Sequence, residues 1–239
     1  MNYIIYSALF FSVILSGLTV LVFKISTRNL KLVLSFSGAY LFAISVLHLI
    51  PEIYSGGNKS IGIYILIGFF LQILLEFFSE GIEHGHIHIH KHSENIFPFT
   101  MMAGLCIHSF LEGMPLADMA ADEKNTKNSL LIGIILHNIP IAIALMSMLL
   151  QSNMKKQLSI VLLVAFALMA PLGTFVSNII SDNMLGNISV FFDRIMGIVV
   201  GIFLHISTTI LFESSENHRF NLLKFITILF GAGIAVITI

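Results

Sequence analysis

The chain has 239 residues, of which 56% are hydrophobic and only 10% are charged, and its formal net charge is −1. Soluble domains carry charges on about a quarter of their residues, so this composition indicates an integral membrane protein. Nucleic-acid binding is excluded because the chain has no basic face to neutralise phosphates. A lone cysteine, Cys106, excludes an internal disulfide, and we interpret it as a small buried hydrophobe.

Eight segments are apolar and long enough to cross a bilayer as a helix, which takes about 20 residues. They cover roughly residues 3–23, 31–51, 60–79, 98–117, 129–151, 158–180, 190–212 and 220–239. The first lacks a basic flank and a small-residue cleavage site, which favours a retained span over a signal peptide. Because the loops are short, we expect residues 1–239 to form a single all-α membrane domain.

The basic residues predict how these spans are oriented, because cytoplasmic loops carry an excess of Lys and Arg. Eight lie after the odd-numbered spans: Lys24, Arg28, Lys31, Lys91, Lys155, Lys156, Arg219 and Lys224. Four lie after the even-numbered spans: Lys59, Lys124, Lys127 and Arg194. The bias predicts that the odd loops are cytoplasmic and that both termini face outward.

Two motifs place ionisable side chains inside the fourth and fifth spans. His108 and Glu112 are four residues apart, hence on one helix face, and His137 precedes Asn138 in the next span. Such groups cost about 2.5–3.5 kcal/mol each at the bilayer centre, which favours a functional role. Imidazole and carboxylate are zinc ligands, so the pattern predicts a divalent-metal site. Ser109 is a weaker candidate ligand or a residue of the ion pathway, and hydrogen bonding between helices is the structural alternative.

Prolines at four places predict kinked or broken helices near these groups. Pro51 closes the second span, Pro115 follows the His108 motif, Pro140 lies within the fifth span and Pro171 within the sixth. Interrupted membrane helices are tolerated where the backbone lines a cavity or meets protein, and in transporters they often mark the ion site.

Further polar residues suggest a pathway. His48 and Glu52 have the same four-residue spacing at the predicted outer end of the second span. We interpret them either as an entrance pair for the ion or as side chains that reach the membrane interface. His205 begins a polar stripe in the seventh span that either lines the pathway or bonds to neighbouring helices. Glu76, near the cytoplasmic end of the third span, we interpret as an interfacial or helix-pairing acid rather than a ligand.

The loop at about 81–97 contains histidines at alternating positions, a composition typical of metal binding. They are His84, His86, His88, His90 and His92. Alternate side chains of an extended chain share one face, so we expect this cytoplasmic loop to collect metal ions for buffering or sensing.

Together these residues resemble the ZIP (Zrt/Irt-like) family of metal transporters over essentially the whole chain. The resemblance rests on eight spans, the His-rich loop, His-x-x-x-Glu-Gly from His108, His-Asn-x-Pro from His137 and the segment from His48 to Glu52. It implies a fold in which spans 1–3 and 6–8 are inverted repeats around spans 4 and 5. It also implies import of Zn²⁺, or of Fe²⁺, Mn²⁺ or Cd²⁺, with His108, Glu112, His137 and Asn138 as transport ligands.

This sequence departs from the pattern of many members at three positions. Ser109 replaces the Asn that often follows the first His, and Ile141 and Ala142 replace a Glu-Gly pair after Pro140. The missing carboxylate could have bridged two metals, so we predict one metal at the centre.

The sequence therefore predicts a divalent-metal transporter in the cell membrane that works by alternating access and not an enzyme. Metal ions and lipid are its partners, and a homodimer is possible. The alternatives are an intramembrane zinc hydrolase with Glu112 as base, and a metal exporter or sensor. No His-Glu-x-x-His motif supports the hydrolase, and no Gly-Lys-Ser/Thr nucleotide motif supports an ATP-driven cycle.

Overall fold

The computed structural model describes residues 2–57, 60–79, 97–117, 124–152, 154–183, 188–213 and 221–238. The regular secondary structure in these ranges is helical, and turns and irregular segments connect the helices. The α-helices are α1 Asn2–Thr19, α2 Thr27–Ile44, α3 Ile50–Ser55, α4 Ile61–Ser79, α5 Phe97–Gly113, α6 Lys124–Gln151, α7 Lys156–Asn183, α8 Ile188–Glu213 and α9 Leu222–Ile237. The all-α prediction is confirmed for the described residues.

A helix lies over each of the eight predicted spans. Within the described ranges, five continuous helical stretches are long and apolar enough to cross a membrane: Thr27–Ser55, Ile61–Ser79, Thr126–Gln151, Lys156–Asn183 and Ile188–Phe212. The apolar helices Tyr3–Thr19 and Leu222–Ile237 are shorter, as is α5 with 17 residues. The eight-span count and the inverted repeat stay predictions.

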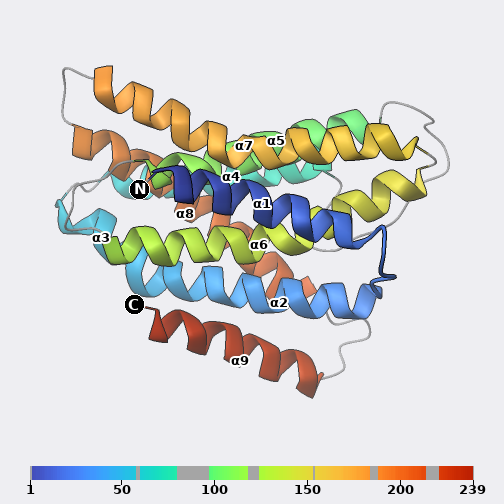
Figure 1. Ribbon diagram of the computed structural model, residues 1–239. Helices are drawn as coiled ribbons and strands as arrows, with labels where there is room; N and C mark the ends of the chain where they lie inside the picture. The colour runs from blue at the N-terminus through green and yellow to red at the C-terminus, as the bar shows by residue number, and fades with distance from the viewer. Residues whose placement is uncertain are drawn as a thin grey trace.

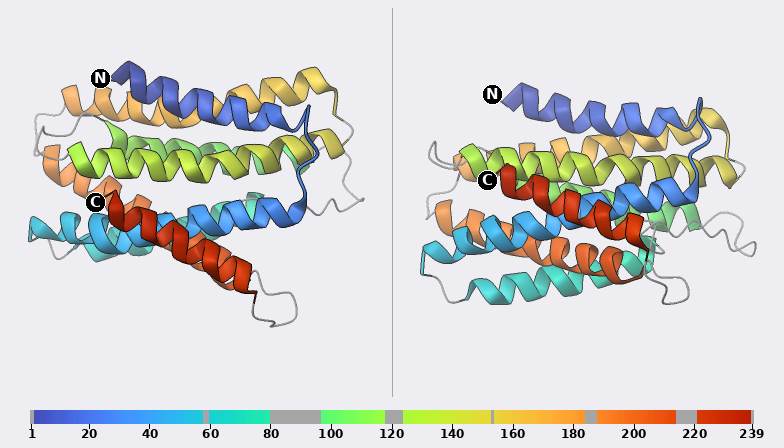
Figure 2. Two further views of the ribbon diagram at one scale, coloured as in Figure 1. Left: turned by 60° about the horizontal axis from the view of Figure 1, so that its bottom comes forward. Right: turned by 90° about the horizontal axis from the view of Figure 1, so that it is seen from below.

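The helices run side by side along one direction, and both ends of the chain lie at the same end of the bundle (Figures 1 and 2). Two apolar clusters fill the interior. The larger includes Tyr40 of α2 and Phe203 of α8, and the smaller includes Leu163 and Phe166 of α7. α6 contributes to both clusters, as α1 and α7 do, so the helix that carries His137 packs into both of them.

Close backbone contacts hold α4 against α8 within this arrangement. A Cβ added at Gly68 would collide with the carbonyl of Ile198, and one at Gly201 would collide with the carbonyl of Ile65. Small residues allow such approach between membrane helices, where packing replaces the hydrophobic effect as the source of association.

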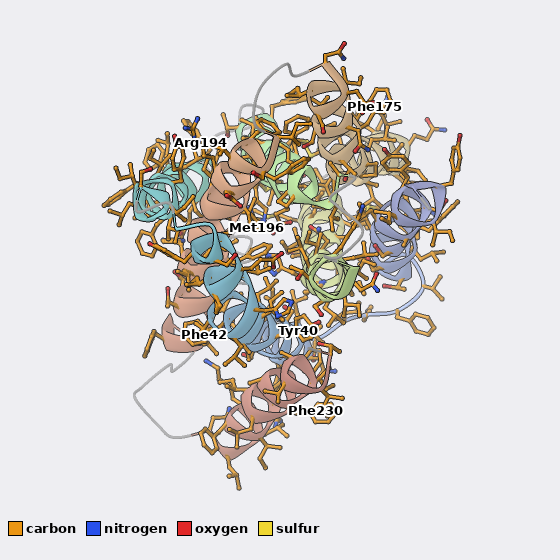
Figure 3. All side chains as sticks on the ribbon, turned by 90° about the vertical axis from the view of Figure 1, so that its left-hand side faces the viewer. Tyr40, Phe42, Phe175, Arg194, Met196 and Phe230 are labelled. Atoms are coloured by element: carbon orange, nitrogen blue, oxygen red, sulfur yellow. The ribbon has the colours of Figure 1, made fainter. Side chains whose placement is uncertain are left out.

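The outer surface of the bundle is apolar, as a lipid-facing surface must be. Phe77 on α4 is 79% exposed and Phe230 on α9 is 63% exposed. Phe175 and Phe230 point outward in Figure 3, whereas Tyr40 and Met196 lie inside the bundle and are buried. The polar groups are therefore turned inward, the arrangement expected of a protein in hydrocarbon.

The prolines act differently from one another. Around Pro51 the chain forms a π-helical segment, Ser45–Leu49, which carries His48 and continues into α3. α5 ends at Gly113 and passes into a 3₁₀ turn, Met114–Leu116, that contains Pro115. The predicted breaks at Pro140 and Pro171 are wrong, because α6 and α7 continue through them. One proline removes a single ladder hydrogen bond, and packing on both sides of a long helix can hold the remaining bonds.

Candidate metal centre

α5 brings the first motif to the middle of the protein through a close contact with α7. A Cβ at Gly113 would collide with the carbonyl of Ala170, and one at Gly173 would collide with the carbonyl of Phe110. The Thr174 hydroxyl also donates a hydrogen bond to the Gly113 carbonyl at 2.7 Å. The glycine of the motif thus fixes the end of α5, one residue beyond Glu112.

α6 supplies the second motif from inside its continuous length. His137 and Asn138 precede Pro140 by less than one turn, and both side chains are buried. Proline cannot donate to the carbonyl four residues earlier, which is that of Leu136. The local backbone is therefore more polar than a regular helix where the two ligand-type side chains lie.

The structure brings His108, Glu112, His137 and Asn138 together. His108 Nε2 lies 3.1 Å from Glu112 Oε1, and Asn138 Nδ2 donates to Glu112 Oε2 at 3.3 Å. The imidazole rings of His108 and His137 are 5.9 Å apart at an angle of 83°. One ligand atom from each of His108, Glu112 and His137 lies within 4.8 Å of the other two.

This spacing suits a small divalent cation. Around a tetrahedral Zn²⁺, with bonds of about 2.0–2.1 Å, neighbouring ligand atoms are separated by about 3.3–3.4 Å. The His108–Glu112 separation of 3.1 Å is slightly shorter than this. The ligand atoms of the whole group lie within 4.8 Å of one another, so small movements of the side chains would bring them to the distances of a metal site. Among the described residues, no other group of three His, Cys, Asp or Glu side chains meets this criterion.

Burial makes the group chemically demanding. His108, Glu112 and His137 are 0% exposed, and Asn138 is 1% exposed. A buried carboxylate is costly unless a cation or hydrogen bonds compensate it. Asn138 Oδ1 is also buried and accepts no hydrogen bond from the described residues, so it offers an amide oxygen as a further ligand. A divalent ion with one carboxylate and two neutral imidazoles would have a net charge of +1.

α4 contributes a residue that the sequence reasoning missed. Gln72 is 0% exposed, and its Oε1 lies 3.1 Å from His108 Nδ1. The sequence did contain a signal for it, namely an amide side chain inside an apolar span and one helical turn before Glu76.

His48 and Glu52 lie away from the central group, at another place along the bundle. His48 Nε2 is hydrogen-bonded to Thr126 Oγ1 of α6 at 2.7 Å. The side chains of His48 and Glu52 are both only partly buried. Glu52 Oε2 accepts no hydrogen bond from the described residues. Ser109, predicted as a pathway residue, is 1% exposed beside His108.

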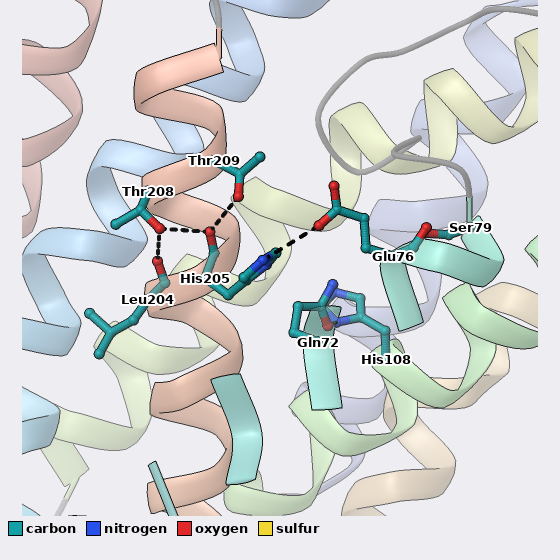
Figure 4. A network of polar contacts seen from close by, with 8 residues as sticks. All are labelled: Gln72, Glu76, Ser79, His108, Leu204, His205, Thr208 and Thr209. Carbon is teal, nitrogen blue, oxygen red and sulfur yellow. Dashed lines mark hydrogen bonds and ion pairs between the residues drawn. The ribbon is translucent and has the colours of Figure 1, made fainter. Parts of the chain in front are cut away.

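His205 meets Glu76 across the contact between α8 and α4 (Figure 4). His205 Nε2 lies 3.5 Å from Glu76 Oε2, with 10% and 28% of the two side chains exposed. The ring of His205 also packs edge-on against Phe69 at 5.0 Å. The Thr208 and Thr209 hydroxyls donate to the His205 carbonyl, so these residues of the polar stripe bond to their own backbone.

Some predicted residues lie outside the described part of the chain. They are the loop histidines His84, His86, His88, His90 and His92. Their role in metal binding stays a prediction.

Comparison with known proteins supports the resemblance. The model of the family described as "ZIP Zinc transporter" matches residues 79–238, a range that contains both motifs. The chain belongs to the ZIP family. It is also 30% identical over 174 residues to "Protein zntD" of Dictyostelium discoideum. That match covers 67% of this chain but only 25% of the relative, so the chain spans about a quarter of that protein's length. ZIP proteins are multi-pass membrane proteins that transport divalent metals such as zinc, and the His–Glu–His group lies in the matched region.

Proposed function

We propose that this ZIP protein transports a divalent metal ion, Zn²⁺ in the first place, across the cell membrane toward the cytosol. The observation that carries this proposal is the fully buried group of His108, Glu112 and His137 on two neighbouring helices. Three ligand-type side chains without solvent would be costly in a membrane protein unless a cation joins them.

In this proposal His108 Nε2, a Glu112 oxygen and one nitrogen of His137 bind the ion, and Asn138 Oδ1 completes the set. Asn138 now donates to Glu112 through its amide nitrogen, which leaves its oxygen available. Imidazole and carboxylate suit Zn²⁺ and other borderline cations, with Fe²⁺, Mn²⁺ and Cd²⁺ as the alternatives.

We infer that the centre holds a single ion. Ile141 and Ala142, which stand where many relatives have Glu-Gly, are both 0% exposed and belong to the apolar cluster around Leu145. No carboxylate therefore follows Pro140 to bind a second ion beside Glu112.

Transport requires that the central group open to one side of the membrane at a time. We assign His48 and Glu52 to the outer approach, and His205 with the His-rich loop at about 81–97 to the cytoplasmic side, with both termini outward. The Lys and Arg bias between odd and even loops supports this orientation. Because an ion that binds protonatable ligands competes with protons, acid should favour its release.

The test is uptake of radioactive zinc into proteoliposomes that contain the purified protein in a determined orientation. The parent is compared with Glu112→Gln and His137→Ala, and with Asp182→Asn as a control that neutralises an exposed carboxylate near the end of α7. Iron and manganese are tested in parallel.

Uptake by the parent, loss in both site variants and retention in the control would support the proposal. Absence of uptake by the parent for every metal under an inward gradient would overturn the importer. Normal uptake by both site variants would leave a transporter but would overturn the ligand assignment.

A further inference from the structure

The α4 helix carries a fully buried amide that reaches the metal centre from outside the ligand-bearing helices. Gln72 is 0% exposed, and its Oε1 lies 3.1 Å from Nδ1 of His108 on α5 (Figure 4). An amide removed from water without a hydrogen bond is costly in apolar surroundings. The ligand-type imidazole of His108 is one hydrogen-bond partner of this buried amide.

The contact between α4 and α5 is fixed close to this bond. A Cβ added at Gly104, one turn before His108, would lie 3.1 Å from the Leu75 carbonyl oxygen on α4. It would also lie 3.4 Å from the backbone nitrogen of Ser79. The two helices thus approach at backbone distance, and Gln72 is held at a defined depth beside His108.

The two nitrogens of His108 face different groups. Nε2 points to Glu112 Oε1 at 3.1 Å, inside the candidate metal centre, whereas Nδ1 points to Gln72. An imidazole that gives the Nε2 lone pair to a metal carries its proton on Nδ1, and that N–H needs an acceptor. The amide oxygen of Gln72 is such an acceptor.

We infer that Gln72 is a positioning residue for the metal, which fixes His108 in the Nδ1–H tautomer and aims Nε2 at the ion. This inference rests on the proposed function, because it presumes that His108 binds metal. Outer partners of metal-bound histidines are often carboxylates, which make the ligand more basic. A neutral amide orients the ring without adding negative charge, so it favours a site from which the ion can leave.

The experiment compares Gln72→Met, which keeps the length but removes the acceptor, with Gln72→Glu, which makes it anionic. Gln157→Met, at an exposed position of α7, controls for the chemical change. Zn²⁺ affinity is measured in detergent by competition with a chromophoric chelator. The tautomer is read by nitrogen-15 NMR of labelled histidine, with the His108 signals assigned by their loss in His108→Ala.

For the parent with Zn²⁺ we expect His108 to be protonated on Nδ1. Loss of an outer-shell partner typically weakens metal binding by about 10–100-fold, and we expect this for Gln72→Met. Gln72→Glu should retain the tautomer, bind at least as tightly as the parent and release Zn²⁺ more slowly. Gln157→Met should match the parent.

Three results would overturn the inference. One is an Nε2–H tautomer of His108 in the Zn²⁺-bound parent. Another is unchanged affinity and tautomer in Gln72→Met, which would make Gln72 a helix-packing residue only. If Gln72→Met does not fold, then unchanged affinity and release in Gln72→Glu would be the overturning result. If the parent itself binds no metal, the proposed function fails instead.

Discussion

Among the described residues, two His–Glu pairs in direct contact have similar chemistry but different settings. His108 and Glu112 lie one turn apart on α5, are both 0% exposed, and have His137 beside them. His205 and Glu76 pair across α8 and α4 at 3.5 Å, with 28% of the Glu76 side chain exposed. The difference shows that a histidine and a glutamate in contact do not define a metal centre. Full burial and a third converging ligand set the α5 pair apart.

The largest effect is expected from neutralising the buried carboxylate. Glu112→Gln preserves shape but removes the only charge that balances the ion in the central group, so Zn²⁺ binding should fall by more than the about 100-fold seen for loss of an outer-shell partner. Glu76→Gln, the same change in the exposed pair, should leave Zn²⁺ affinity nearly unchanged. Equilibrium binding in detergent measures both, and equal losses would contradict the distinction between the pairs.

Acid should weaken the central group steeply. Metal binding needs both imidazoles unprotonated, so protons compete with the ion and affinity falls as the pH falls. Two competing protons give up to about 100-fold per pH unit. Binding isotherms measured over a series of pH values check this slope.

The exposed pair provides the comparison for that pH profile. His205→Ala removes an imidazole outside the group, so the slope should be unchanged, whereas His137→Ala should halve it. An altered slope in His205→Ala would show that His205 binds the same ion.

Much of this arrangement was predictable from the sequence. The ionisable residues at helical spacing in apolar spans predicted which side chains would share a face, and the structure brings His108, Glu112, His137 and Asn138 together. The apolar runs likewise predicted where helices would lie. These features are local, so periodicity and composition are sufficient to find them.

Contacts between helices far apart in the chain were not predictable. Nothing in the sequence states that Gln72 would meet His108, 36 positions later, or that Glu76 would pair with His205. The effect of proline also depended on tertiary packing, since α6 and α7 continue through Pro140 and Pro171. The depth and neighbours of a polar side chain decide its role, and both are set by the fold.

When the exposed pair is broken, we expect a smaller effect, and we expect it on transport rather than on binding. His205 does not belong to the group of His108, Glu112 and His137. His205→Ala should therefore leave Zn²⁺ affinity nearly unchanged while slowing uptake, because we place His205 on the cytoplasmic pathway. Uptake rate and equilibrium affinity are measured on the same preparation. An unchanged rate would make the His205–Glu76 contact a helix-pairing interaction.

The smallest effect on Zn²⁺ affinity is expected from polar groups that only hold helices together. Such a group provides the reference against which substitutions in both His–Glu pairs are compared. The buried Tyr40 hydroxyl lies 3.1 Å from the Ser129 carbonyl of α6 and 3.1 Å from Thr238 Oγ1 beyond α9. Tyr40→Phe removes these bonds without changing the ring, and hydrogen bonds between membrane helices contribute about 0.6 kcal/mol each on average. We expect the free energy of unfolding to drop by about 1 kcal/mol, with Zn²⁺ affinity unchanged, by denaturant titration in detergent.

Tyr3→Phe, at a position 85% exposed, should change neither. A loss of Zn²⁺ affinity in Tyr40→Phe would mean that buried polar contacts act on the metal centre from a distance. Full burial and a third ligand beside the pair would then no longer explain why His108 and Glu112, and not His205 and Glu76, form the metal centre.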